Sequence, residues 1–361
     1  MCNKLKPVLI LILILIVYFA GSPLMAKSGA DIYAQTCAAC HDSGADRTPT
    51  KADLKSMSPQ AILTALETGP MRVIGIFSLT GPDRIAVAEH LSGQTYDANW
   101  KGDVANQCAP AAWPSAEPFA KPHWNGWGPG TRNARYQPAN MANLDAKDVG
   151  NLELQWAFAF PGETVVESHA SVVDGRLFIG SRGAAVYSLD AKSGCAYWRF
   201  DTEASVKTAI KISDVPIKGR YLAFFGDIGG AIYAVDAANG ELVWKIYADS
   251  HPAARTIGAF QLHDGKLYIP VSSLEEGLAA DPNYECCSFR ASVMRVDAMT
   301  GVVEWRKYLV EEPAQMTGKN ANGRAMWGPS GAAVWSSPTL DPKRNVLYVS
   351  TGDNYSHPES K

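Results

Sequence analysis

The chain has 361 residues, of which 47% are hydrophobic and 19% are charged, and this balance is typical of a folded globular protein with more than one domain. The formal net charge is −3, and no block of basic residues stands out in the sequence. Nucleic acid is therefore excluded as a predicted partner.

The N-terminus has the pattern of an export signal. Lys4 and Lys6 precede an unbroken apolar run over residues 8–20, and Ala26 is the small residue at a plausible cleavage site. The run is too short to span a bilayer comfortably, so we predict a signal peptide over residues 1–26 rather than a membrane anchor. Export implies a periplasmic or secreted protein, in which disulfides can form.

A haem-attachment motif lies in residues 27–95, which we predict to form a small helical domain. Cys37, Cys40 and His41 form a Cys-x-x-Cys-His pattern. With this spacing each thiol can add to one haem vinyl group, and the imidazole then lies under the iron as the proximal ligand. The alternative is a zinc or redox site. Zinc would need a second pair of ligands, and adjacent cysteines such as Cys286–Cys287 have the wrong spacing for one.

Helices are predicted on both sides of this motif. One helix begins near residue 29. A second begins at Ser58, which is a suitable N-cap followed by proline, and a third begins near residue 81. This order resembles a class I cytochrome c domain. In such a domain the iron needs a distal ligand, for which we predict Met71, with Met57 and His90 as the alternatives.

Residues 96–121 mix Ala, Pro, Asn and Asp without periodicity and are predicted to be a linker. Beyond them a repeat occurs three times, with Gly four residues after an Asp and Trp eight residues after it. Each copy follows a strand-like run. The copies are Asp190, Gly194 and Trp198; Asp236, Gly240 and Trp244; and Asp297, Gly301 and Trp305. The Asp and Gly suit a tight turn between antiparallel strands, and the Trp can wedge against the next sheet. The repeat therefore predicts a β-propeller.

This repeat resembles the tryptophan-docking motif of quinoprotein alcohol dehydrogenases, which are eight-bladed propellers that bind pyrroloquinoline quinone (PQQ) on their central axis. The resemblance implies a mixed fold, in which a small all-α cytochrome c domain is followed by an all-β propeller over residues 122–361. About four to five blades are expected at this length. The catalytic Asp base of the family is expected beyond Lys361, so the sequence is interpreted as C-terminally truncated, with the base unknown.

The same resemblance implies a PQQ and Ca²⁺ site. Trp335 is similar to the tryptophan that forms the floor under the PQQ ring. Asp353 stands where the family has a Ca²⁺-binding Asn, and Asn354 is the alternative ligand. Carboxylate oxygens are good Ca²⁺ ligands, so this departure from the family pattern is compatible with the site.

A second stretch of the chain is similar to another part of the family's PQQ site. By position, Ser273 is expected to contact PQQ and Glu276 to bind Ca²⁺, with Glu275 as the alternative ligand. Arg290 is a candidate for holding a PQQ carboxylate by a bidentate contact.

Two adjacent cysteines, Cys286 and Cys287, complete the resemblance, because quinoprotein alcohol dehydrogenases carry a vicinal disulfide against the PQQ face. Their place between repeats is similar to the polyvinyl alcohol dehydrogenase branch. Free or separately paired thiols are the alternative. Cys108 and Cys195 have no predicted partner. Cys108 is interpreted as a surface loop residue, and Cys195 as a residue packed within a blade turn.

These features predict an exported quinohaemoprotein dehydrogenase that oxidises an alcohol with PQQ and Ca²⁺ and passes the electrons to haem c. The substrate class is a small or polymeric alcohol, possible examples being polyvinyl alcohol and other secondary alcohols. The electron acceptor would be a soluble cytochrome or the respiratory chain. Two alternatives are a non-enzymatic propeller–cytochrome module for electron transfer or assembly, and a PQQ-dependent sugar dehydrogenase. A bridged Cys286–Cys287 pair would weaken the sugar alternative.

Overall fold

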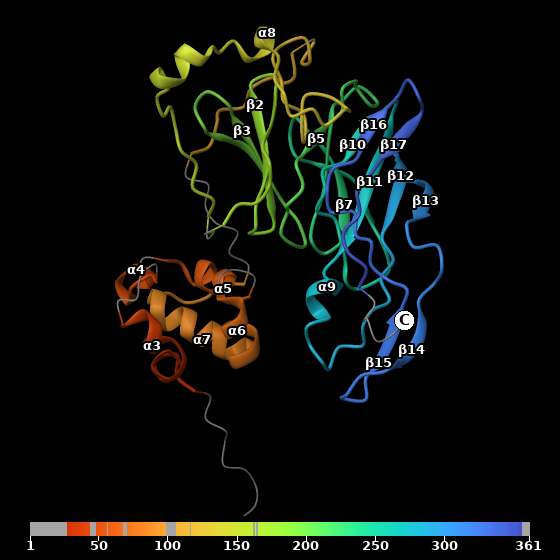
Figure 1. Cartoon of the computed structure of the whole chain (residues 1–361). Helices are drawn as coiled ribbons and strands as arrows, with labels where there is room; N and C mark the ends of the chain where they lie inside the picture. Colours follow the sequence, from red (N-terminus) through yellow and green to blue (C-terminus); the bar gives the residue numbers. More distant parts are fainter. Residues whose placement is uncertain are drawn as a thin grey trace, which may run out of the picture. The chain divides into compact units, whose positions relative to one another are not determined.

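A computed structural model describes residues 27–43, 48–55, 57–67, 71–98, 106–115, 117–161, 163 and 165–355. Its contacts divide the chain into two units, residues 1–100 and 101–361, and this division falls inside the predicted linker (Figure 1). The predicted signal peptide lies outside the described residues. Among the helices of the described segments, none has the length and apolar character needed to cross a membrane.

The first unit is helical. Its helices are α2 (Gly29–Ile32), the π-helical turn η1 (Tyr33–Cys37), α3 (Ala38–His41), α4 (Lys51–Lys55), α5 (Pro59–Glu67), α6 (Arg72–Ser78) and α7 (Gly81–Ser92). As predicted, the Ser58 hydroxyl caps α5 by accepting a hydrogen bond from the Ala61 N–H at 3.2 Å. A capping box of Thr80 and Asp83 begins α7, and Gly93 ends it with a φ of 68°.

The core of this unit forms where α7 packs against α2 and α5. A Cβ on Gly29 would lie 2.1 Å from the Ala86 carbonyl oxygen, so only glycine permits this close crossing. The apolar faces meet there and are buried. They comprise Ile32, Tyr33, Ile62, Leu63, Leu66, Leu79, Val87, Ala88 and Leu91. A single core therefore lies next to the haem-attachment motif, and the predicted all-α domain is confirmed.

The second unit contains three successive antiparallel sheets with the strand order of propeller blades (Figure 1). The first sheet consists of β1 (Ser171–Val173), β2 (Arg176–Gly180), β3 (Ala185–Asp190) and β4 (Ala196–Asp201). The second consists of β5 (Lys211–Ile212), β6 (Leu222–Gly226), β7 (Ala231–Asp236) and β8 (Leu242–Tyr247). The third consists of β9 (Ala254–Arg255), β10 (Gln261–His263), β11 (Lys266–Ser273), β12 (Ser292–Asp297) and β13 (Val303–Tyr308).

Shorter elements surround these blades. The helical elements are α8 (Ala139–Ala142), the 3₁₀ turn η2 (Ala146–Asn151) and α9 (Glu275–Leu278). Two hairpins follow the third blade, β14 (Gln315–Lys319) with β15 (Ala325–Gly328), and β16 (Thr339–Asp341) with β17 (Val346–Tyr348). The described residues thus form three complete blades and begin a further sheet.

The repeated tryptophans join each blade to the next. The Trp198 indole N–H donates to the Ala237 carbonyl at 3.1 Å, and the Trp244 N–H donates to the Ala298 carbonyl at 3.0 Å. Each ring also lies against the glycine of the following copy. A Cβ would come within 3.0 Å of Trp198 at Gly240 and within 2.9 Å of Trp244 at Gly301. The predicted docking role of the repeat is confirmed.

A further tryptophan, which lies outside the three copies of the repeat, docks in the same way. The Trp156 N–H donates to the Ala191 carbonyl at 3.2 Å, and the ring lies against Gly194. Residues 152–160 therefore take the place of the outer strand of a preceding blade. With the β16–β17 hairpin, parts of five blades are present, in line with the predicted partial propeller.

Replacing Gly194 by alanine is expected to weaken this docking. Gly194 has a φ of 74°, and its Cβ would lie 2.6 Å from the Trp156 ring. The left-handed backbone alone costs about 1 kcal/mol in an alanine variant, and displacement of the ring should bring the loss of unfolding free energy to about 2–4 kcal/mol. Gly175→Ala is the control, because Gly175 has a φ of 76° and open space around its Cβ position. Urea unfolding should show a clearly smaller loss for Gly175→Ala, and equal losses would contradict the docking argument.

The predicted linker contains residues that pack against the first blade. Cys108 forms a disulfide with Cys195, with the two Cα atoms 5.1 Å apart. Trp113 packs edge-on against Phe178, and its indole N–H donates to the Asp174 carbonyl at 3.3 Å. Cys108 and Cys195, which the sequence left unassigned, are thus paired, and the disulfide fastens this segment to the blade.

Candidate functional site

The haem-attachment motif lies where η1 meets α3. Cys37 is partly buried, Cys40 is exposed, and both are free thiols. Burial raises the pKa of the Cys37 thiol, and the neighbouring Cys40 raises it further. A thiol with a raised pKa holds little thiolate near neutral pH, which does not favour the redox alternative.

His41 is oriented as a metal-binding histidine requires. Its side chain is buried, and Nδ1 lies 2.7 Å from the Pro49 carbonyl oxygen. Because a carbonyl only accepts hydrogen bonds, Nδ1 must carry the proton, which leaves Nε2 of the neutral ring as the nitrogen able to bind iron. A hydrogen bond of this kind also fixes the ring orientation of a metal ligand.

The candidate distal ligands fall into two groups. Met57 and Met71 are partly buried and pack against the same helical core as Cys37. His90 instead packs at the crossing of α2 and α7, where its ring centroid lies 6.3 Å from that of Tyr33. The structure therefore brings both methionines to the core beside the motif and gives His90 a packing role.

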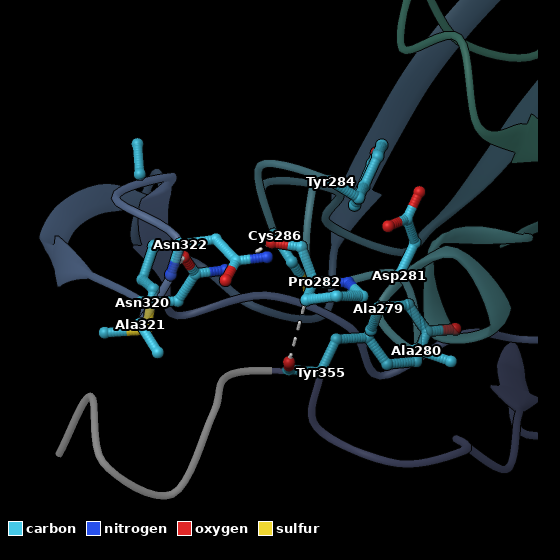
Figure 2. Close-up of a pocket in the computed structure, with 12 residues that line it drawn as sticks. Ala279, Ala280, Asp281, Pro282, Tyr284, Cys286, Asn320, Ala321, Asn322 and Tyr355 are labelled. Carbon is cyan, nitrogen blue, oxygen red and sulfur yellow. Dashed lines mark hydrogen bonds between the residues drawn. The ribbon is translucent and has the colours of Figure 1, made fainter.

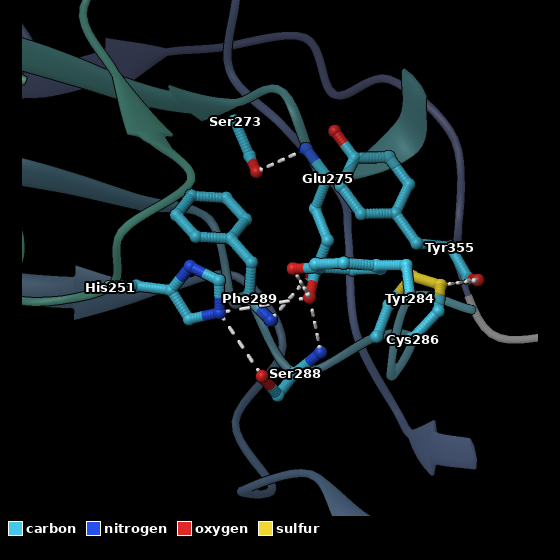
Figure 3. The surroundings of a disulfide bond; sticks show 9 residues. His251, Ser273, Glu275, Tyr284, Cys286, Ser288, Phe289 and Tyr355 are labelled. Carbon is cyan, nitrogen blue, oxygen red and sulfur yellow. Dashed lines mark hydrogen bonds and ion pairs between the residues drawn. A yellow bond between two sulfur atoms is a disulfide. The ribbon is translucent and has the colours of Figure 1, made fainter. Parts of the chain in front are cut away.

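Glu275, the alternative Ca²⁺ ligand, is fully buried in a network of hydrogen bonds (Figure 3). Its Oε1 accepts from the Ser288 N–H at 2.9 Å and the Tyr284 hydroxyl at 3.1 Å, and its Oε2 accepts from the Phe289 N–H at 2.8 Å. His251 Nε2 also lies 3.7 Å from Oε1. Glu275 therefore holds the loop that carries Cys286 and Cys287.

Cys286 and Cys287 form a vicinal disulfide, so the predicted pairing is present. Cys287 is fully buried, whereas Cys286 is partly accessible. The Cys286 carbonyl accepts a hydrogen bond from the Trp327 N–H of β15 at 2.8 Å, and its sulfur lies 4.0 Å from the Tyr355 carbonyl oxygen. One side of the disulfide thus borders the β14–β15 hairpin, and the other borders the end of the described chain.

Glu276 and Asp353, the predicted Ca²⁺ ligands, are both exposed, and the charges of both raise the pKa of the same tyrosine hydroxyl. Burial raises the pKa of Tyr355 to about 12, with further contributions from the negative charges of Glu276, Glu275 and Asp353. The two predicted ligands come from segments far apart in the chain, yet both lie within electrostatic reach of the same side chain. Tyr355 is not predicted from the sequence, because a tyrosine after a Gly-Asp-Asn turn carries no distinctive signal.

Within the described residues, no cluster of three or more His, Cys, Asp or Glu side chains is arranged to hold a metal ion. Ca²⁺ takes six to eight oxygen ligands, so Glu276 and Asp353 would need oxygens from other groups, such as a cofactor, to complete a site. The donor set is therefore suitable for a shared ion–cofactor site.

Trp335 lies against the turn that carries Asp353. Its side chain is 61% exposed, and a Cβ on Gly352 would lie 3.0 Å from its Nε1. The absence of a side chain at Gly352 therefore allows the indole to pack against this turn and still present a broad open surface. The predicted PQQ floor and one predicted Ca²⁺ ligand are thus neighbours.

Ser273 and Arg290 have protein partners in this structure. The buried Ser273 hydroxyl accepts a hydrogen bond from the Glu275 N–H at 2.8 Å. The Arg290 guanidinium donates to the Glu311 carbonyl at 2.9 Å and lies 4.1 Å over the Tyr308 ring. The contact of Ser273 places it beside the Glu275–Glu276 pair, whereas Arg290 faces the segment after β13. Their predicted contacts with PQQ stay predictions.

A cavity of about 320 Å³ lies beside the vicinal disulfide (Figure 2). Its walls come from the segment after α9, the turn between β14 and β15, and the two residues Cys286 and Tyr355. The other lining residues are Ala279, Ala280, Asp281, Pro282, Tyr284, Asn320, Ala321, Asn322, Ala325 and Met326. The cavity adjoins the partly accessible cysteine of the disulfide.

Two family models match the chain, one in each unit. Residues 25–91 match the model described as cytochrome C oxidase, cbb3-type, subunit III, and residues 142–317 match the model described as outer membrane protein assembly factor BamB. The first match covers the helical unit with Cys37, Cys40 and His41. The second covers the three complete blades.

Individual relatives match across both units. Polyvinylalcohol dehydrogenase from Pseudomonas sp is 35% identical over 353 residues, which are 93% of this chain and 54% of the relative. The enzyme of the same name from Sphingopyxis sp. (strain 113P3) is 37% identical over 349 residues, which are 92% and 52% of the two chains. This chain thus spans about half the length of the curated relatives it matches.

Among solved structures, the quinohemoprotein alcohol dehydrogenase ADHIIG from Pseudomonas putida HK5 is similar to this chain. The TM-score is 0.50 at 22% identity, over 66% of this chain and 35% of that one. At this identity the likeness concerns the fold, and it agrees with the propeller arrangement of β1 to β13.

Proposed function

We propose that the chain belongs to the quinohaemoprotein alcohol dehydrogenase family, in its polyvinylalcohol dehydrogenase branch, and that it is part of an enzyme that oxidises an alcohol. The observation that carries the proposal is the identity of 35% across both the helical unit and the blades. A cytochrome c domain and a quinoprotein propeller on one chain would combine substrate oxidation with electron transfer.

The proposed cofactor site lies between the Asp353 turn and the vicinal disulfide. When bound, PQQ accepts electrons from the alcohol while Ca²⁺ polarises its carbonyl as a Lewis acid. The open face of Trp335 provides a flat apolar surface, and Glu276 and Asp353 provide oxygen ligands. Glu275 keeps Cys286 and Cys287 in place through its bonds to the same loop. The residues present therefore fit the cofactor and the ion.

The proposed haem site uses Cys37 and Cys40 for covalent attachment, His41 as the proximal ligand and Met71 as the distal ligand. The bond from His41 to Pro49 supports this assignment, because it presents Nε2 for the iron. The haem would take electrons singly and pass them to an acceptor such as a soluble cytochrome or the respiratory chain.

We also propose that the protein acts in the periplasm or is secreted. The sequence pattern of residues 1–26 supports export, although these residues lie outside the described structure. The disulfides Cys108–Cys195 and Cys286–Cys287 also suit an oxidising compartment.

A non-enzymatic assembly propeller is the second candidate, because the BamB model matches residues 142–317. Blade geometry alone supports both candidates. The haem-attachment motif and the vicinal disulfide favour the dehydrogenase, since a scaffold has no evident use for either.

Haem reduction by candidate substrates tests the proposal. The full-length protein, matured with haem and supplied with PQQ and Ca²⁺, should show the absorption change of haem reduction when a secondary alcohol or polyvinyl alcohol is added. Reduction by aldoses alone would favour the sugar dehydrogenase alternative. Absence of reduction with every alcohol would contradict the proposal.

Met71→Ala is expected to change the haem spectrum and potential. If the Met71 sulfur binds the iron, the oxidised variant should lose the weak sulfur-to-iron absorption band, and its reduction potential should fall by on the order of 0.1 V or more. Spectroelectrochemical titration measures both effects. Met57→Ala is the matched control, because Met57 packs against the same core. If Met57→Ala loses the band and Met71→Ala keeps it, the assignment of the distal ligand is wrong.

A further inference from the structure

Tyr355 carries a buried hydroxyl that the proposed function does not yet use. The side chain is 7% exposed, and its ring packs in the core of the third blade with Cys287 and Phe289. Within the described part of the chain its hydroxyl has no hydrogen-bond partner. Because burying an unpaired hydroxyl is unfavourable, such a group calls for a partner that the described residues do not supply.

The backbone around Tyr355 is held by hydrogen bonds to the segment that contains Gly331. The Tyr355 N–H donates to the Ser330 carbonyl at 3.3 Å, and the Asp353 carbonyl accepts from the Ala332 N–H at 2.8 Å. Gly331 makes this close approach possible, since its φ is 97° and a Cβ would lie 2.7 Å from the Tyr355 nitrogen. The position of the hydroxyl is therefore set by the fold rather than by a flexible chain end.

Tyr284, a second tyrosine near Glu275, has a hydroxyl with a hydrogen-bond partner (Figure 3). The Tyr284 hydroxyl donates to Glu275 Oε1 at 3.1 Å, and the other bonds of Glu275 go to two backbone N–H groups. Figure 3 shows the Tyr355 ring directed toward the beginning of α9, where Glu275 lies. Glu275 is thus already approached by the Tyr284 hydroxyl, two backbone N–H groups and His251, and the Tyr355 hydroxyl makes no hydrogen bond to it.

The adjacent Glu276 is the candidate acceptor. It is exposed, and it follows Glu275 in the first turn of α9, toward which the Tyr355 ring is directed (Figure 3). In the structure its carboxylate makes no hydrogen bond to the Tyr355 hydroxyl. A cation between Glu276 and Asp353 would draw their carboxylates together, and a carboxylate that binds an ion through one oxygen can accept a hydrogen bond on the other.

We propose that Tyr355 is a positioning residue of the cation site, whose hydroxyl donates a hydrogen bond to the Glu276 carboxylate when Glu276 and Asp353 hold a divalent cation. The inference rests on the proposed function, which places Ca²⁺ between these two side chains. Hydrogen bonds to ligating side chains orient them and typically change metal affinity by about 10- to 100-fold. The buried hydroxyl is thus unpaired without the ion and paired with it.

The test compares two tyrosine-to-phenylalanine variants in the full-length, haem-loaded protein after removal of divalent cations with a chelator. Calorimetric titration with Ca²⁺ in the presence of PQQ measures affinity, and chemical unfolding with and without Ca²⁺ measures stability. The near-ultraviolet difference spectrum on Ca²⁺ addition reports a tyrosine hydroxyl that gains an acceptor. Tyr284→Phe is the matched control, because it removes a hydroxyl that already has a partner.

Tyr355→Phe should weaken Ca²⁺ binding roughly tenfold, abolish the tyrosine difference signal and leave the unfolding midpoint unchanged without Ca²⁺. Tyr284→Phe should lower the midpoint with and without Ca²⁺ and keep the wild-type Ca²⁺ affinity. Wild-type Ca²⁺ affinity in Tyr355→Phe, while Glu276→Gln binds weakly, would overturn this inference and leave the calcium site standing. No saturable Ca²⁺ binding by the wild-type protein in the presence of PQQ would overturn both the site and the inference.

Discussion

Replacing both Cys37 and Cys40 by alanine is expected to give a protein with no covalently bound haem. Both thiols are free in the structure, and both stand within one turn of His41. Each thioether bond requires one of these sulfurs, so the double variant can hold haem only through its axial ligands and packing. After maturation in a cytochrome c expression system, acid–acetone should extract all haem from the double variant and essentially none from the wild-type protein.

Two comparisons make this result specific. Each single variant should retain haem through one remaining thioether, with an altered absorption maximum because one vinyl group stays free. Cys108→Ala is the control for the loss of a cysteine elsewhere, since Cys108 is bonded to Cys195 in the other unit. Haem that resists extraction in the double variant would contradict the assignment of the motif.

The repeat shows which parts of the fold a sequence can specify. An Asp, a Gly four residues later and a Trp eight residues later define a tight turn and the ring that docks on the next turn, so the local pattern predicted the contacts of Trp198 and Trp244. Trp156 makes the same contact and was missed, because Leu152 stands where the repeat has its Gly, although Asp148 lies eight residues before the ring. The pattern identifies the turn, whereas the docking partner belongs to the neighbouring blade.

The candidate site was harder to predict from the sequence, because the roles of its residues depend on which side chains are buried in the folded protein. Glu275 and Glu276 are identical in chemistry and adjacent in sequence, but Glu275 is fully buried among hydrogen-bond donors and Glu276 is exposed. The pairing of Cys108 with Cys195 joins positions 87 residues apart, and neither local sequence indicates it. The unpaired hydroxyl of Tyr355 likewise exists only once the chain has folded around it.

Glu275 is buried and Glu276 is exposed, so we expect Glu276 to be the glutamate that couples Ca²⁺ binding to PQQ binding. If both bind at the Glu276–Asp353 site and share oxygen ligands, Ca²⁺ should raise the affinity for PQQ by roughly 10- to 100-fold. Glu276→Gln and Asp353→Ala should each abolish this gain, because each removes a charged oxygen ligand. Titration of PQQ into the full-length protein, followed by quenching of tryptophan fluorescence with and without Ca²⁺, measures the coupling.

Glu275→Gln tests the opposite role for the neighbouring carboxylate. Glutamine would place an NH₂ group against donors that now bond to a carboxylate, namely the N–H groups of Ser288 and Phe289. We therefore expect a loss of about 2–4 kcal/mol in unfolding free energy with the Ca²⁺-dependent gain retained. Glu311→Gln is the control for removing an exposed carboxylate, since Glu311 pairs with Lys307 at the surface. If Glu275→Gln abolishes the gain and Glu276→Gln preserves it, the two glutamates have exchanged roles. Equal PQQ affinity with and without Ca²⁺ in the wild-type protein would show that ion and cofactor do not share a site.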